Sequence, residues 1–268
     1  MRRGLLATAL FLMLALLGGA AQAQVALDNK VTAVKQLSWS HTANGSNLVL
    51  VVGVAINAGS GTYVKTLTWG ATSLSCLFAV DGGSSTKTCG STSGSGHRAE
   101  IWGAALGSLS STTNTVTITL NSGSSSIVVA GSASFTGASQ STPFGTAQGH
   151  GGLDSSASLT FSGLTSQAAV VDTLSISTDQ QPSTVGAGQT SLWSGETASS
   201  GGTYGQGSWM SGSNNSGTIT QSWSNGTTHD GYVAVPINPA PAAGRRGQTI
   251  VGQAEPIRGT VVPVAAVN

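Results

Sequence analysis

Short apolar segments with a period of two residues are the feature of this sequence that most restricts its fold. In the segment TVTITL, residues 115–120, threonine alternates with an apolar residue at every position. Similar runs recur along the chain, and Gly, Ser, Asn or Pro lies at each junction. Because successive side chains of a strand point to opposite faces, this pattern predicts β-strands, and almost nothing repeats at helical spacing.

The spacing of these runs predicts the fold class. With about ten to twelve strands and no helix between them, we expect an all-β chain that folds as a single-domain, antiparallel two-sheet sandwich of the jelly-roll-like type. The sandwich is expected to span residues 24–240. The clearest predicted strands are 47–57, 63–69, 98–106, 115–120, 127–135, 157–161, 168–177, 189–193, 217–223 and 231–237.

Both ends of the chain differ from this body. Residues 1–23 place Arg2 and Arg3 before an apolar run that ends in Ala-Gln-Ala, which is typical of a secretory signal peptide. We therefore expect a secreted protein, extracellular or periplasmic, with no membrane span after cleavage. Residues 241–268 are rich in Pro and Gly and are expected to form a flexible tail. The tail could alternatively pair with an exposed strand and support self-assembly.

Charge and cysteine content restrict the partners and the compartment. Charged residues are 7% of the chain, and removal of Arg2 and Arg3 changes the formal net charge from +1 to −1. Nucleic acid is not an expected partner, because phosphate binding needs a basic surface. Cys76 and Cys89 are the two cysteines, and turn residues lie between them. In an oxidising compartment they are predicted to form a disulfide.

Several segments together resemble a known kind of module. The chain between residues 31 and 239 is similar to a jelly-roll-like β-sandwich module that recurs in bacterial secreted proteins and in phage tail-associated proteins. The resemblance implies an extracellular module, mostly of unassigned function, and it includes no catalytic signature. The segments that carry it are SWSHTANGSNLVLVVGVAI, RAEIWGAAL, NTVTITL, SFTGASQSTPFG, GAGQTSLW and QSW with GYVAVPINPA.

Few residues are arranged for catalysis. The sequence has no G-x-S-x-G, H-E-x-x-H or C-x-x-C motif, so no catalytic residue is predicted. Glu100 alternates with Arg98 and Trp102 on one face of a predicted strand. That face could line a cleft, but we expect a solvent-facing ion pair beside a half-buried Trp. A glycan-active enzyme, which needs two carboxylates in one groove, is the third functional hypothesis.

No metal site or other cofactor is predicted. His41 and His229 could approach each other, with Asp230 as a helper, if the first and last predicted hairpins are neighbours, but a metal needs three or four ligands. We expect Trp39 and His41 to mark the start of a hairpin. Structural calcium stays open, because calcium uses loop carboxylates without a fixed spacing. The candidate carboxylates are Asp81, Asp154 and Asp179.

Aromatic residues give the leading functional hypothesis. Trp193, Tyr204 and Trp209 flank or interrupt a Gly/Ser-rich segment that is predicted to be a loop. Exposed rings stack on sugars, so these three are the predicted ligand-binding residues; packing in the core is the alternative. We expect a secreted, non-catalytic module that binds a glycan or a cell surface. A structural subunit of an extracellular assembly, such as a fibre, coat or matrix, is the second hypothesis.

Overall fold

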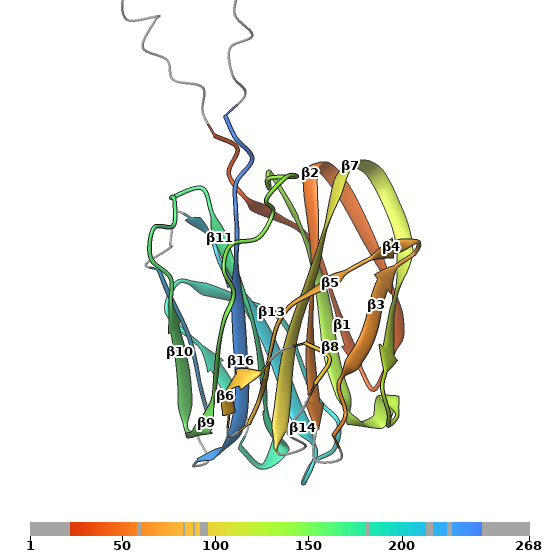
Figure 1. Cartoon of the computed structure of the whole chain (residues 1–268), viewed down its shortest axis with the longest axis vertical. Coiled ribbons are helices and arrows are strands. Elements are labelled where there is room, and N and C mark those ends of the chain that lie inside the picture. The colour runs from red at the N-terminus through yellow and green to blue at the C-terminus, as the bar shows by residue number, and fades with distance from the viewer. Residues whose placement is uncertain are drawn as a thin grey trace, which may run out of the picture. The chain divides into compact units, whose positions relative to one another are not determined.

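Antiparallel strands account for most of the chain in the computed structural model (Figure 1). The structure describes residues 22–57, 61–82, 84–87, 89–91, 96–180, 183–212, 217–223 and 227–242. None of the helices in these residues is long and apolar enough to cross a membrane. The elements are β1 (Ala26–Val34), β2 (Ser38–Asn57), β3 (Val64–Trp69), β4 (Thr72–Ser73), β5 (Ser75–Asp81), β6 (Ser84–Lys87), β7 (His97–Leu120), η1 (Ser125–Ile127), β8 (Val128–Thr136), β9 (Gln148–Asp154), β10 (Ser156–Thr160), β11 (Ala169–Ser177), η2 (Thr178–Gln180), β12 (Ser183–Val185), β13 (Gln189–Glu196), β14 (Thr203–Met210), β15 (Thr218–Trp223) and β16 (Thr228–Ile237).

These strands form three sheets. The large sheet has the order β1-β8-β2-β7-β3-β4, with β5 paired to β7 and β6 to β5. The middle sheet has the order β13-β14-β11-β16-β9, and the small sheet has the order β10-β15-β12. The predicted all-β antiparallel sandwich is confirmed, but it has more than the two predicted layers, because the small sheet adds one and the large sheet folds back on itself to form another.

The large sheet folds back on itself because β2 and β7 are long and bent. β2 has 20 residues and β7 has 24, and they pair along nearly their whole length. Gly45 (φ 132°) and Gly107 (φ 76°) adopt backbone angles that favour glycine, and the register shifts between Ala43 and Val49. We call residues 38–44, residues 112–120, β3 and β4 the outer half of the large sheet, and the rest of that sheet the inner half.

The bend overturns one sequence-based interpretation. The polar segment between Trp39 and Leu48 was expected to be a hairpin turn, but it continues within β2 as an irregular part of the strand. The two predicted strands at 98–106 and 115–120 are likewise parts of the single strand β7. A polar, glycine-containing segment is typical of both a turn and a bulge, so the sequence pattern alone does not separate them.

Three apolar cores separate the layers, which Figure 1 shows from β10 on the left to β3 and β4 on the right. The first core lies between the two halves of the large sheet and contains Val52 and Trp69. The second, between the large and middle sheets, contains Val51 and Phe135, and the third, between the middle and small sheets, contains Ile219. The apolar run of β2 is therefore continuous because both faces of the strand are buried.

Candidate functional site

The outer half of the large sheet presents a regular array of hydroxyl groups to solvent. Ten Ser and Thr side chains lie on the face opposite the first core, on four neighbouring strands, and all are exposed or partly exposed. None of them carries a charge. We call this set the hydroxyl face. Its members are Ser38, Ser40 and Thr42 of β2, Thr113, Thr115, Thr117 and Thr119 of β7, Thr66 and Thr68 of β3, and Ser73 of β4.

Strand pairing places these hydroxyls in rows. Ser38, Thr117, Thr68 and Ser73 lie side by side across the four strands, and the next row pairs Ser40 with Thr115. Side chains on one face repeat about every 6.6–6.8 Å along a strand and about every 4.7–4.9 Å between strands. The hydroxyl groups therefore form a two-dimensional grid, because strand pairing gives them a regular spacing in both directions.

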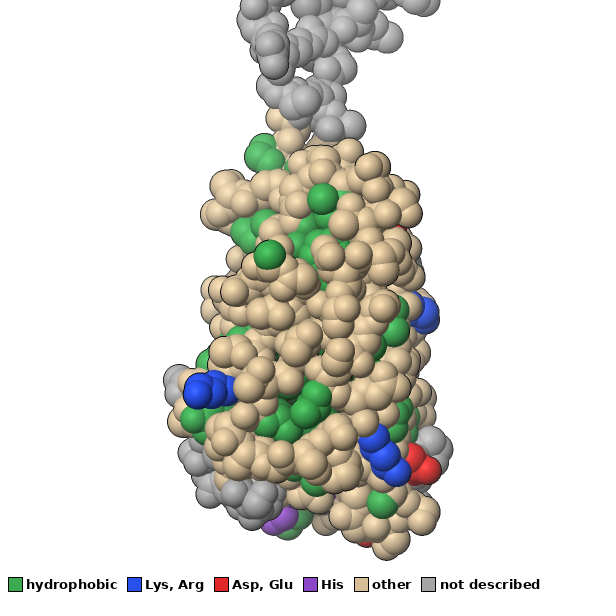
Figure 2. Space-filling model, turned by 90° about the vertical axis from the view of Figure 1, so that its right-hand side faces the viewer, with side chains coloured by type: hydrophobic (Ala, Val, Ile, Leu, Met, Phe, Trp, Pro, Cys, Tyr) green, Lys and Arg blue, Asp and Glu red, His purple; other side chains and the backbone are tan. Residues whose placement is uncertain are grey.

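Figure 2 shows the molecule from the side on which β3 and β4 lie in Figure 1. Uncharged polar side chains and backbone cover most of this view, and the charged side chains in it are few. Within the face, Thr42 Oγ1 lies 2.7 Å from Thr113 Oγ1, so these two hydroxyls are hydrogen-bonded to each other. The face can thus offer many donors and acceptors at once to a flat partner.

The inner side of the same strands holds the hydroxyl face in place. Trp39, Leu67, Trp69 and Val116 alternate with its hydroxyl residues and are buried in the first core. The indole N–H of Trp69 donates to the backbone oxygen of His41 at 3.0 Å. Because buried side chains anchor the residues that alternate with them, the spacing of the exposed hydroxyls is set by the strands and the first core.

A chain of hydrogen bonds runs beneath this face. Trp39 Nε1 donates to Ser132 Oγ at 2.9 Å, and Ser132 Oγ lies 2.9 Å from His41 Nδ1. On the other side of the ring, His41 Nε2 lies 3.1 Å from Ser134 Oγ, and Ser134 Oγ donates to Asp28 Oδ2 at 2.7 Å. An indole can only donate and a carboxylate can only accept, so the proton of a neutral His41 resides on Nε2. Burial lowers the pKa of His41 to about 4, against the charge of Asp28.

This arrangement excludes His41 from metal binding. Both ring nitrogens are occupied by serines, and the side chain is buried. His41 and His229 do not come together, because His41 packs in the first core whereas His229 lies on β16 beside Gly82 and Gly96. Trp39 and His41 are structural residues within β2.

The predicted aromatic site is not an exposed surface. The segment that was expected to be a loop forms the paired strands β13 and β14. The Trp193 side chain is 2% exposed, and its ring fills the space opposite Gly53, Gly131 and Gly207, where any Cβ would overlap it. Gly53 and Gly131 lie inside two of the predicted strands, and the absence of a side chain at these positions accommodates the indole.

The other two rings pack on the two faces of β14. Tyr204 is 8% exposed and belongs to the third core. Trp209 is partly buried against the second core, with its ring centroid 5.5 Å from that of Phe135 in an edge-to-face arrangement. The predicted exposure of Trp193 and Tyr204 is therefore wrong, because a register shift in β13 brings Trp193 into the second core beside Leu192, and Tyr204 faces the third core.

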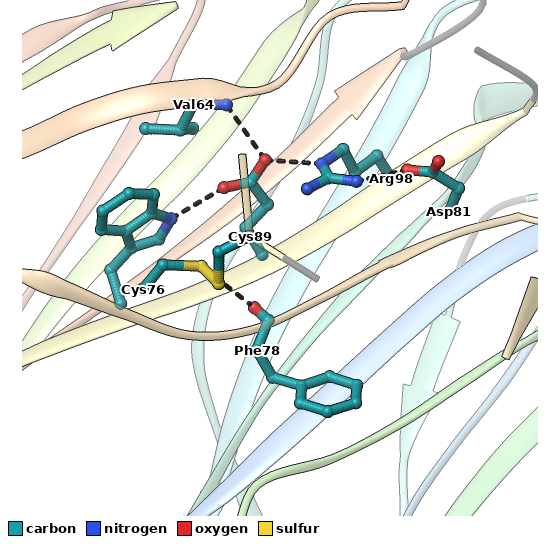
Figure 3. Close-up of a disulfide and its surroundings, with 8 residues drawn as sticks. Val64, Cys76, Phe78, Asp81, Cys89 and Arg98 are labelled. Carbon is teal, nitrogen blue, oxygen red and sulfur yellow. Dashed lines mark hydrogen bonds and ion pairs between the residues drawn. A yellow bond between two sulfur atoms is a disulfide. The ribbon is translucent and has the colours of Figure 1, made fainter. Parts of the chain in front are cut away.

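Arg98 and two carboxylates form a buried ionic cluster, shown in Figure 3. Arg98 Nη1 lies 2.6 Å from Asp81 Oδ1, and Arg98 Nε lies 2.6 Å from Glu100 Oε1. Trp102 Nε1 and the Val64 amide donate to the Glu100 carboxylate at 2.8 and 3.0 Å. The expected solvent-facing ion pair is wrong, because all three charged side chains have no solvent exposure. Burial lowers the pKa of Arg98, but the two carboxylates outweigh that effect and raise it.

The predicted disulfide is confirmed. Cys76 of β5 is bonded to Cys89, with their Cα atoms 6.0 Å apart, next to the ionic cluster (Figure 3). Its position links β5 to the segment after β6.

Of the three candidate calcium carboxylates, Asp81 already faces Arg98, and Asp179 is exposed beside Ser177.

A second buried carboxylate lies between the middle and small sheets. Asp172 accepts hydrogen bonds from Tyr232 Oη (2.7 Å), from Ser208 N and Oγ (2.6 and 2.8 Å) and from Gln221 Nε2 (2.9 Å). Burial raises the pKa of Asp172 to about 7, although these donors oppose the shift. The carboxylate is fully buried and enclosed by its donors.

One pocket of about 310 Å³ opens near the start of β9. Its walls include Thr146, Gln148, Phe161, Leu164 and Pro236, and none of its lining residues is titratable. The volume is at the small end of ligand sites. The paired carboxylates that a glycosidase needs do not line it.

The hydroxyl face was not predicted from the sequence, although the alternating threonines of residues 115–120 are part of it. The alternation of TVTITL predicts a strand, but it does not indicate which surface the threonines of that strand form. The array depends on pairing residues 113–119 with residues 38–42 and with β3, which are far away in the chain. Only the sheet topology brings them together.

Comparisons with protein-family models, curated proteins and solved structures found no match. The antiparallel sandwich that the jelly-roll-like resemblance implies is present in the structure, but the comparisons give no support for the particular module. Fold and surface define the class: a disulfide-bonded β-sandwich protein with buried polar clusters and an exposed hydroxyl face.

Proposed function

We propose that the chain is a secreted, non-catalytic β-sandwich module that binds an ordered, hydroxyl-rich polymer surface, such as a crystalline or cell-wall polysaccharide. The observation that carries this proposal is the hydroxyl face, in which four strands present ten uncharged hydroxyl side chains in rows. The proposal keeps the predicted glycan or cell-surface partner and replaces the predicted aromatic residues.

The physical argument rests on many weak contacts. A hydrogen bond contributes a net stabilisation of only about 0.5–1.5 kcal/mol, since each one replaces bonds to water. Threonine side chains in strands are stiff, so little conformational freedom is lost when they bind. A flat polymer surface can engage several rows together, whereas a soluble sugar reaches only a few hydroxyls. The face should therefore distinguish ordered polymer from free oligosaccharide.

The test is a depletion assay with the untagged mature chain, residues 24–268. Microcrystalline cellulose, chitin and purified cell-wall sacculi are incubated with the protein, and free protein is measured in the supernatant. We expect saturable binding to at least one of these polymers and no competition by its soluble oligosaccharides. No depletion by any polymer would contradict the proposal.

A structural subunit of an extracellular assembly is the second candidate. Its support is the formal net charge of −1 after removal of the leader, which leaves little electrostatic repulsion between copies. The predicted role of the C-terminal tail in self-assembly concerns residues 243–268, which lie outside the described residues. Size-exclusion chromatography with light scattering tests this candidate: concentration-dependent oligomers support it, and a monomer at all concentrations contradicts it.

A further inference from the structure

His150, Asp154 and Asp230 form a cluster on the face of the middle sheet that is turned towards the small sheet. β9 and β16 are paired so that Gly152 lies opposite Asp230. His150 and Asp154 are each two residues from Gly152 along β9, so their side chains lie on the same face of the sheet as the side chain of Asp230. One possible ligand atom of each residue lies within 4.8 Å of the other two.

Asp230 is the unusual member of this cluster. Its side chain has no solvent exposure, and neither carboxylate oxygen has a hydrogen-bond partner among the residues that the structure describes. The neighbouring His150 and the backbone amides of Asp230 and Gly152 act to lower its pKa. Burial outweighs them and raises the pKa of Asp230 to about 6. A buried carboxylate that accepts no hydrogen bond is costly and calls for a cation.

The other two residues connect the buried carboxylate to solvent. The side chains of His150 and Asp154 are 36% and 45% exposed, and His150 Nε2 lies 2.8 Å from Asp154 Oδ2 and 4.0 Å from Asp230 Oδ2. Gly152 keeps the space between them open. A Cβ at this position would overlap Asp154 Oδ2 and come within 2.9 Å of His150 Nε2.

We propose that His150, Asp154 and Asp230 bind a divalent transition-metal ion of the zinc class. One imidazole and two carboxylates are typical ligands of Zn²⁺, and a tetrahedral ion needs ligand atoms about 3.3–3.5 Å apart. The distances from His150 Nε2 to Asp154 Oδ2 (2.8 Å) and to Asp230 Oδ2 (4.0 Å) lie on either side of that range. Two carboxylates supply the charge that a divalent ion neutralises, and the imidazole favours zinc over calcium. The exposed side of the cluster leaves room for a water ligand. This inference does not depend on the proposed function.

The experiment is isothermal titration of Zn²⁺ into the untagged, chelator-treated mature chain at neutral pH. We expect one Zn²⁺ per chain. Asp230→Asn keeps the side-chain shape but removes the charge, and His150→Gln removes the imidazole. Each should weaken Zn²⁺ binding by at least about tenfold, the scale seen even for residues that only support metal ligands. The matched controls Asp179→Asn and His229→Gln, both exposed and outside the cluster, should bind as the parent does.

Thermal melting gives a second measurement on the same proteins. Zn²⁺ should raise the melting temperature of the parent and of both controls, but not that of Asp230→Asn. If Asp230→Asn does not fold, the Zn²⁺-dependent shift in melting temperature of the parent is compared with that of Asp154→Asn and His150→Gln, whose substituted positions are partly exposed. The proposal is overturned if the parent does not bind Zn²⁺, if the cluster variants bind it equally well, or if Ca²⁺ binds more tightly than Zn²⁺.

Discussion

Trp193 and Gly131 are a matched pair across the interface between the middle and large sheets. A Cβ on Gly131 would come within 2.7 Å of Trp193 Cβ and would overlap the indole ring. The bulky side chain of β13 therefore depends on the absence of a side chain in β8. This relationship explains both a glycine inside a buried strand and the burial of a Trp that the sequence placed at a surface.

The first prediction concerns this pair. Gly131→Ala should destabilise the fold by about 1–3 kcal/mol, because the added methyl group has to displace the indole. Urea unfolding gives the free energy of unfolding. Gly145→Ala is the matched control, since its nearest neighbour, Pro236 Cβ, is 3.2 Å from the added atom and a smaller shift suffices. Equal losses in the two variants would contradict the pairing of Trp193 with Gly131.

The buried ionic cluster predicts a strong effect of removing its cation. Arg98→Met leaves Asp81 and Glu100 buried without their counter-charge, and the expected loss is about 3–5 kcal/mol of unfolding free energy. Lys65→Met, at an exposed position of β3, is the control and should change stability by no more than about 0.5 kcal/mol. Similar stability of the two variants would show that the cluster is not the strong interaction that its geometry indicates.

The sequence was sufficient to predict the strands with strong alternation and the disulfide. The segment 115–120 and the apolar part of β2 were found because local pattern determines them. The strands that were missed include β5, the short strands β4, β6 and β12, and three strands whose alternation is weakened by Gly or polar residues, namely β1, β9 and β14. The strand conformation of these last three comes from pairing with β8, β16 and β11, which is a property of the fold rather than of the segment.

The sites were harder to predict, for the same reason. Exposure of Trp193 and Tyr204 was inferred from Gly and Ser neighbours in the sequence, but Gly53 and Gly131, which make room for the Trp193 ring, lie on the distant strands β2 and β8. Asp230 and His150 are 80 positions apart in sequence and meet only through the pairing of β9 with β16. No local spacing in the sequence indicates that cluster.

His41 should make stability dependent on pH. Its pKa is about 4 in the folded protein against an ordinary value of 6.5, so the unfolded chain binds more protons between these values. The resulting stability is complete above pH 6.5 and is lost as pH falls towards 4, by about 3 kcal/mol. Urea unfolding at several pH values should show a shallower fall for His41→Gln than for the parent. If the stability of the two proteins fell in parallel with pH, that result would contradict a neutral His41 imidazole with hydrogen bonds at both ring nitrogens.

The disulfide should add moderate stability. Cys76 and Cys89 are 13 residues apart, and closing a loop of this size contributes about 3 kcal/mol in the chain-entropy model. A melting experiment with and without reductant measures this effect, and Cys76→Ala/Cys89→Ala, which melts identically in both conditions, is the control. Thiol titration of the denatured, unreduced protein should detect no free thiol; two thiols per chain would contradict the bond.

The hydroxyl face is the central claim, and its most direct test is the binding isotherm of Thr115→Val/Thr117→Val on the polymer that retains the parent protein. Valine keeps the shape and the strand preference of threonine but removes its hydroxyl. Two lost hydrogen bonds should weaken binding by about 1–3 kcal/mol. The matched control is Thr160→Val, an exposed strand threonine of the small sheet. We predict weaker binding for the double variant, with an unchanged melting temperature and a control that binds as the parent does. Equal affinity of all three proteins would contradict binding through the hydroxyl face.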